Sequence, residues 1–180
     1  MTAAENELRK AFFAHRNGVV ADALRAAGDP HPFIMGCQLT DIVAIIANYA
    51  PDATLAQTLW DDSDHRECRM AATMLYPPES MPMDIALEWC HSVETAEMAD
   101  VLCHRLLRKL PYASTLVKQL MADDAVLVRY TAFRLLLNLL LMGKVNPTAA
   151  MRRQIEEEQA RGEALLQPLL ASLLEEFGEA

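Results

Sequence analysis

Apolar residues recur along this chain at the three- and four-residue spacing of amphipathic helices, and strand-like alternation of useful length is absent. Proline and glycine fall between the periodic segments. The pattern predicts an all-α fold. The expected helices cover residues 3–15, 19–27, 40–49, 52–60, 64–75, 82–91, 94–110, 113–121, 124–142 and 148–177. Asp52 and Asp124 stand where N-caps are expected, and Pro168 should kink or break the last helix.

The middle helices form pairs of a short and a long helix, each spanning about 30 residues. The pairs are 52–60 with 64–75, 82–91 with 94–110, and 113–121 with 124–142. A repeated helical pair that cannot bury its own apolar stripe must stack on its neighbours. We therefore predict an α-solenoid of antiparallel, HEAT-like helical pairs, an α-α superhelix, over a single domain at 1–180. Residues 148–180 would form an acidic terminal cap, and an irregular helical bundle is the alternative.

Charge changes this picture only when it is divided along the chain. The 180 residues carry a net charge of −9, which argues against a generally basic nucleic-acid-coating protein. Residues 1–100 carry −10, residues 101–153 carry +7, and residues 154–180 carry −6. Because stacked repeats present one helix face to a concave surface, the middle block predicts a local basic groove that could follow phosphates. The alternative is a solvated face that pairs with the acidic tail.

The remaining chemistry-bearing residues have ordinary structural explanations. The four cysteines form no CxxC pair and have no zinc-finger spacing, so we expect buried, reduced thiols and a cytoplasmic protein. Trp60 and Trp89 are expected to be packing anchors. Asp100 and His104 share one helix face and form either a surface pair or a proton-transfer site. We expect no cofactor, no metal, no leader and no membrane span.

Six short stretches, in this order and spacing, resemble the HEAT-repeat DNA alkylation repair proteins of the AlkD type. They are Phe12–Asn17 with Phe33–Cys37, Leu59–Trp60 with Glu67–Ala72, and Thr95–Asp100 with Val126–Arg129. The likeness runs from about residue 8 to residue 140. It implies a DNA glycosylase-like, bacterial hydrolase that cleaves the N-glycosidic bond of alkylated purines in duplex DNA. Carried over by position, Asp100 corresponds to the catalytic aspartate and Arg129 to a phosphate-holding arginine.

The family's aromatic positions are not kept. Its tryptophan–aspartate–x–x–aspartate motif reads Ala96-Glu97-Met98-Ala99-Asp100, and its tryptophan three residues before Arg129 is Val126. Indole rings bind and stabilise cationic groups, so their loss makes the catalytic expectation doubtful. We therefore expect DNA-backbone contact on a concave face through Arg105, Arg108, Arg129 and Arg134. The alternative is a non-catalytic HEAT-repeat scaffold whose partner is another protein.

Overall fold

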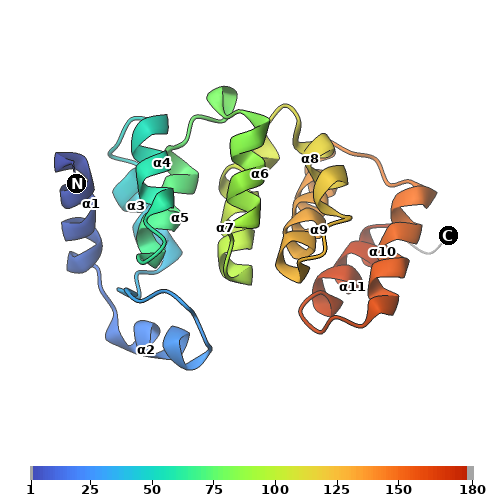
Figure 1. The fold of residues 1–180 in the computed structure, drawn as a ribbon, viewed down its shortest axis with the longest axis horizontal. Coiled ribbons are helices and arrows are strands. Elements are labelled where there is room, and N and C mark those ends of the chain that lie inside the picture. Colours follow the sequence, from blue (N-terminus) through green and yellow to red (C-terminus); the bar gives the residue numbers. More distant parts are fainter. Residues whose placement is uncertain (1, 178–180) are drawn as a thin grey trace. The chain divides into compact units, whose positions relative to one another are not determined.

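The computed structural model describes residues 2–177, and within them every regular element is a helix (Figure 1). The all-α prediction is confirmed. The elements are α1 Ala3–Ala14, α2 Gly18–Ala26, α3 Leu39–Ile46, α4 Ala53–Asp61, α5 Arg66–Leu75, η1 Pro78–Ser80, α6 Met83–His91, α7 Ala96–Arg105, η2 Leu107–Lys109, α8 Ala113–Leu120, α9 Val126–Leu141, α10 Ala149–Arg161 and α11 Gln167–Glu176. Two of them, η1 and η2, are single 3-10 turns.

The structure divides two of the predicted helices, and each forms two separate elements. The segment 94–110 ends as an α-helix at Arg105, because Leu106 leaves the helical region (φ −123°, ψ −65°) and leads into η2. The segment 148–177 divides at Gly162, which adopts the left-handed conformation (φ +79°) that ends many helices. Pro168 then stands in the first turn of α11, so the predicted break is confirmed.

One of the two N-cap predictions is confirmed and the other is wrong. Asp52 caps α4 by accepting the amide of Leu55 at 2.9 Å, as expected. Asp124 does not cap α9, because the N-cap position is Ala125. Asp123 instead accepts the Ala125 amide at 2.8 Å and thereby fixes the entry to α9.

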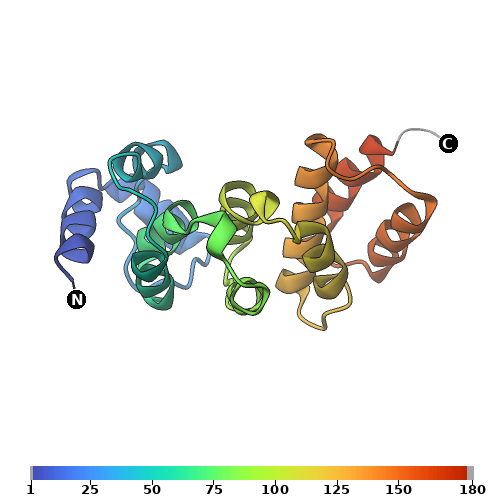
Figure 2. The same cartoon turned by 90° about the horizontal axis from the view of Figure 1, so that it is seen from above.

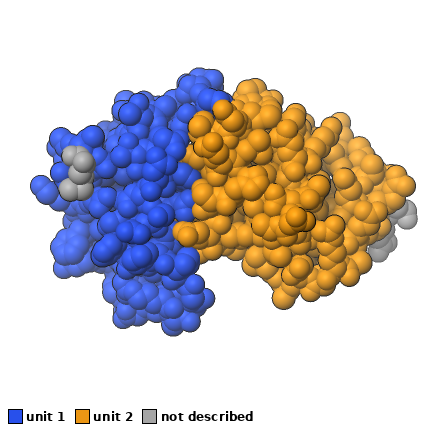
Figure 3. All heavy atoms as spheres, viewed as in Figure 1, with its two compact units in different colours: residues 1–82 blue, residues 83–180 orange. Residues whose placement is uncertain are grey.

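The chain forms two compact units, Met1–Pro82 and Met83–Ala180 (Figure 3). In the first unit α4 packs on α5, and α3 and α1 also contact α5. In the second unit α7 and α8 both pack on α9, and α11 packs against both α9 and α10 (Figure 2). The single domain over 1–180 stays a prediction. Part of the expected cap, 178–180, lies outside the described residues.

Both cores are apolar and contain the residues expected there. All four cysteines are free and buried, and Trp60 and Trp89 are buried, so these predictions are confirmed. Burial raises the thiol pKa values of Cys37, Cys68 and Cys90 to about 12, which keeps these sulfurs protonated at neutral pH.

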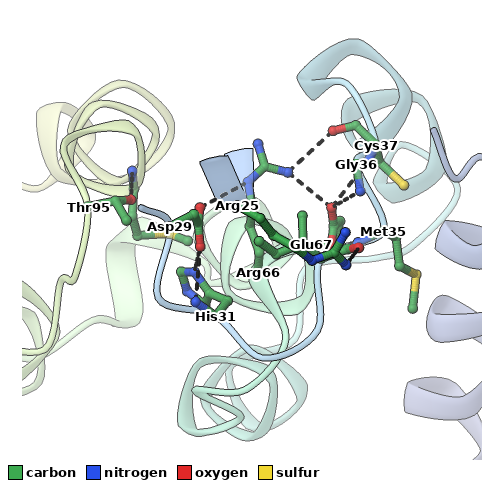
Figure 4. Close-up of polar contacts among 11 residues, drawn as sticks. Arg25, Asp29, His31, Met35, Gly36, Cys37, Arg66, Glu67 and Thr95 are labelled. Atoms are coloured by element: carbon green, nitrogen blue, oxygen red, sulfur yellow. Dashed lines mark hydrogen bonds and ion pairs between the residues drawn. The ribbon is translucent and has the colours of Figure 1, made fainter. Parts of the chain in front are cut away.

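In the first unit, a buried carboxylate on α5 fixes the turn before α3 (Figure 4). The backbone amides of Met35, Gly36 and Cys37 donate to Glu67 over 3.1, 2.9 and 3.3 Å. Gly36 has φ +76°, and a Cβ there would lie 2.2 Å from the carbonyl oxygen of Asn17. Only glycine fits this close approach, and Glu67 stabilises the turn that requires it.

The buried charges around Glu67 are paired with one another. Arg66 donates to Glu67 at 3.0 Å and lies 3.9 Å from Asp29. The Asp29 carboxylate is in turn 2.6 Å from the His31 ring (Figure 4). We name Asp29, His31, Arg66 and Glu67 the paired cluster. Its charges are compensated inside the protein, so removal of one partner would leave another buried without its compensation.

Candidate nucleic-acid interface

The predicted site residues other than Arg129 lie where the C-terminal half of α7 and η2 meet α9, all within the second unit. Asp100 and Arg105 are on α7, Arg108 is on η2, and Arg134 is on α9. Each of these side chains is only partly exposed. The break at Leu106 separates the direction of η2 from that of α7, so the cations do not follow one straight helix.

Asp100 is held by two groups from α9. Its Oδ1 lies 3.1 Å from Nε of Arg134 and accepts a hydrogen bond from the Tyr130 hydroxyl at 3.0 Å. Tyr130 and Arg134 are four residues apart and therefore share one face of α9. The side chains of Asp100, Tyr130 and Arg134 therefore form one contact group, in which the carboxylate already has a cationic partner. No contact joins Asp100 to His104, so the predicted pair is not formed among the described contacts.

The pKa of Asp100 is raised above its usual value by burial. The Arg134 guanidinium and the Tyr130 hydroxyl act in the opposite direction, and the nearby Glu97 carboxylate adds to the rise. Burial also raises the pKa of the Tyr130 phenol well above its usual range, so Tyr130 remains the donor. Sequence reasoning did not identify Tyr130, although its spacing from Arg134 along α9 could have indicated it.

Beside the contact group of Asp100, Tyr130 and Arg134 lie more cations than carboxylates. We name them the basic cluster. It consists of His104, Arg105, Arg108, Lys109, Arg134 and Lys144. Lys144 follows α9 and donates its Nζ to the carbonyl oxygen of Arg108 at 2.7 Å, which ties the end of α9 to η2. Among the described residues, no carboxylate lies at ion-pair distance from Arg105, Arg108, Lys109 or Lys144.

Mutual repulsion within the basic cluster is visible in its titratable groups. Burial lowers the pKa of His104, and Arg108, Arg105, Arg134 and Lys109 lower it further. Burial also lowers the pKa of Lys109, with Arg108 and Arg105 acting in the same direction. These shifts show that the positive charges act on one another at short range. Such a region favours an incoming anion.

Three guanidinium groups in the basic cluster have a shielded Nε without a hydrogen-bond partner, and of these only Arg134 has a carboxylate of the described residues at ion-pair distance. Nε of Arg105 and Nε of Arg108 are buried from solvent and have no hydrogen-bond partner. A buried donor without a partner is costly. The excess of cations around these donors favours an anion at the exposed part of the cluster.

Arg129 differs from the arginines of the basic cluster because it is buried and paired. It is 4% exposed, and its Nε donates to Glu158 of α10 at 2.8 Å. Its NH1 donates to the carbonyl oxygens of Asp123 and Asp124 at 2.9 and 2.8 Å. The guanidinium therefore links the start of α9 to α10. Glu158 belongs to the acidic C-terminal segment, so one cation of the +7 segment does pair with that segment, in a buried contact and not on a solvated face.

The positions where the resemblance places aromatic rings are the first residues of two helices. Ala96 begins α7 and Val126 begins α9. Neither side chain can stack on a base or form a cation–π contact. Asp100 is thus the one residue of the expected catalytic set present near the basic cluster.

The described residues contain no group of three or more His, Cys, Asp or Glu side chains that could hold a metal ion. None of the described helices has both the length and the apolar character needed to cross a membrane.

Comparison with known proteins identifies the family. The family model described as "DNA alkylation repair enzyme" matches residues 8–178, which is nearly the whole chain. The comparisons with curated proteins and with solved structures gave no match. The match extends the likeness beyond residue 140, where the sequence motifs ended, and includes α10 and α11. The chain belongs to the family of DNA alkylation repair enzymes.

Proposed function

We propose that this protein binds the phosphate backbone of duplex DNA through the basic cluster. We infer that it serves alkylation repair by this binding and not by hydrolysis of the N-glycosidic bond of a damaged base. The observation that carries the proposal is a group of neighbouring cations in which, among the described residues, Arg105, Arg108, Lys109 and Lys144 have no carboxylate at ion-pair distance. Phosphate oxygens are strong acceptors and carry the charge that this group lacks. Family membership supplies the DNA context.

The chemistry around Asp100 supports binding more than hydrolysis. A carboxylate that stabilises a cationic sugar must direct its charge at that sugar. Here Oδ1 of Asp100 is engaged by Arg134 and Tyr130, and the Arg134 cation offsets the carboxylate charge. Ala96 and Val126 provide no aromatic wall for a cationic base. We assign Asp100 the role of positioning Arg134 for a backbone phosphate.

The α-solenoid of HEAT-like repeats is part of the same proposal. Two of the three predicted pairs, α4 with α5 and α8 with α9, pack on each other, and α10 packs on α11. The predicted pair of α6 and α7 does not pack closely, because both helices contact α9 instead. Stacked pairs with one shared concave face would line up cations from successive long helices. That arrangement would present the basic cluster to several phosphates of one duplex, and a small-angle scattering profile of the protein tests whether the chain has an extended superhelical form.

Binding of a plain and a methylated duplex at two salt concentrations tests the proposed function. Neutralisation of about four phosphates predicts that log K falls with log salt with a slope of about −3.6. The double variant Arg105→Ala/Arg108→Ala should lose about two units of that slope. Lys10→Ala, which removes an exposed cation of α1, is the matched control and should leave the slope unchanged within error.

Base release, measured in the same samples, separates binding from catalysis. We expect the wild type and Asp100→Asn to release methylated purines at the same background rate. Release by the wild type that Asp100→Asn abolishes would assign hydrolysis to Asp100 and overturn the binding-only reading. A DNA affinity that changes neither with salt nor in the double variant would show that the basic cluster does not bind phosphate. That result would favour a protein–protein scaffold.

A further inference from the structure

A second candidate site lies in the second unit, between α8, the end of α9 and the first turn of α10. It is a cavity of about 450 Å³, within the range of small-molecule sites in proteins. Its walls are mostly aliphatic and include two flexible methionines. The apolar lining residues are Val117, Met121, Leu136, Val145, Ala150 and Met151.

The cavity exists because α10 does not pack closely on α8. The helix is held instead by its contact with α11 and by the buried Glu158–Arg129 pair at the opposite end from Thr148. Its first turn therefore leaves an apolar space against Val117 and Leu136. Unfilled apolar surface of this kind forgoes dispersion contacts, and an apolar ligand would supply them.

Charge at the cavity selects the polar end of such a ligand. Lys118 is the one charged side chain among its described lining residues, and it is exposed with no carboxylate at ion-pair distance. The first turn of α10 contains no acidic residue. Ser114 and Gln154 add neutral hydrogen-bonding groups to the lining. The polar groups of the lining therefore match an anion better than a cation.

One carboxylate borders this arrangement. A neighbouring cavity of about 210 Å³ shares Lys118 and Gln154 and is lined also by Glu157 and Glu158. Glu158 is engaged by Arg129 and Arg161 at 2.8 and 3.2 Å. Glu157 is thus the acidic group that would compete with a bound anion for Lys118, and removing its charge should favour the ligand.

We propose that this cavity binds an amphipathic carboxylate, namely a medium-chain aliphatic acid with its chain between α8 and α10 and its carboxylate at Lys118. The cavity volume of about 450 Å³ lies in the range of small-molecule sites, so a medium-length chain can enter it. This site is separate in its residues from the basic cluster, and it stands or falls independently of DNA binding. A bound acid would bridge α8 and α10 and stabilise the C-terminal helices.

Calorimetric titration of the full chain with hexanoate, octanoate and decanoate tests the proposal. Affinity should rise about three- to fourfold for each methylene that enters the cavity. Octanol has the same chain without the charge and should bind about two- to fivefold more weakly than octanoate. A lack of saturable binding, or equal binding of octanoate and octanol, would overturn the assignment.

Variants locate the binding on the structure. Lys118→Met should weaken octanoate binding about two- to fivefold and leave octanol binding unchanged, whereas Lys10→Met, an equal change on α1, should alter neither. Glu157→Gln should strengthen octanoate about twofold. Ala150→Phe places a ring in the cavity from an exposed helix position and should abolish binding of both ligands. Octanoate binding that survives Lys118→Met and Ala150→Phe unchanged would place the ligand elsewhere and refute the proposal.

Discussion

The paired cluster of the first unit and the basic cluster of the second use the same residue types in opposite ways. In the first, Arg66 is buried and has carboxylates at 3.0 and 3.9 Å. In the second, Arg105 and Arg108 are half-exposed, have no carboxylate at ion-pair distance and keep shielded donors without acceptors. The loss of one partner from a compensated pair leaves a buried charge alone, whereas a cluster of uncompensated cations at the surface attracts anions.

Arg129 shows that the location within the chain does not decide which use applies. It belongs to the +7 segment, yet it is buried and bound to Glu158 like the arginine of the paired cluster. What distinguishes these arginines is whether each has a carboxylate partner, and this can be tested residue by residue.

The largest expected effect is on stability, at Glu67. Glu67→Ala leaves Arg66 and three backbone amides without their acceptor. Loss of one partner of a buried ion pair typically costs about 3–5 kcal/mol. Urea unfolding should show this loss, and Glu7→Ala, at an exposed position on α1, should change stability by less than about 0.5 kcal/mol. Equal effects of the two variants would contradict a structural role for the paired cluster.

The next effect concerns Arg129. Arg129→Met leaves Glu158 buried without its main partner and should cost about 3 kcal/mol. The double variant Arg129→Met/Glu158→Met removes both charges and should recover most of that loss. The free energies of unfolding of the wild type, Arg129→Met, Glu158→Met and the double variant measure the coupling. Additive losses, with no recovery in the double variant, would show that the two side chains do not act as a pair.

A smaller effect is expected in the pH dependence of DNA binding. In the free protein the pKa of His104 lies below 6.5, because burial and four cations disfavour the charged ring. Stability from this group is therefore complete above pH 6.5 and is lost as pH falls through the lowered pKa. Bound phosphates reverse the field and raise that pKa, so binding takes up a proton.

DNA affinity should accordingly rise as pH falls from about 7 to 5.5, by up to about tenfold for a one-unit change in the pKa of His104. His104→Gln should bind with a flatter pH profile, which fluorescence anisotropy of a labelled duplex can measure. A profile that is unchanged in His104→Gln would place the proton uptake on another group.

The smallest effect is the stability change at Arg108. Because its cation has no carboxylate partner, Arg108→Ala should alter the free energy of unfolding by less than about 0.5 kcal/mol. The repulsion on Lys109 that it removes could even make the variant slightly more stable. A loss of several kcal/mol, seen by thermal or urea unfolding, would show that Arg108 serves the fold and not a ligand.

Most of the fold follows from local sequence signals. Helical periodicity predicts the elements, and Asp52 and Pro168 mark real boundaries, because capping and the missing proline amide act within one turn. The turn at Leu106 has no such marker. Leu106 and Leu107 are both buried, so packing against α9 decides where α7 ends, and periodicity cannot show this.

The site is less accessible from sequence, since charge counts do not reveal partners. The +7 segment contains the cations that lie near one another in the fold, among them Arg105, Arg108 and Arg134. A groove that follows phosphates stays a prediction. Burial of Arg129 depends on Glu158, which is 29 residues away on another helix. The Tyr130–Asp100 contact likewise joins residues 30 positions apart. Such pairings require the folded structure.

The most direct test of the central claim is the salt dependence of duplex binding for the wild type and for Arg105→Ala/Arg108→Ala. Uncompensated cations predict a wild-type slope of log K against log salt of about −3.6 and a loss of about two units in the double variant, with unfolding free energy retained. A slope that is the same in both proteins would contradict the account, because it would show that the basic cluster does not contact phosphate.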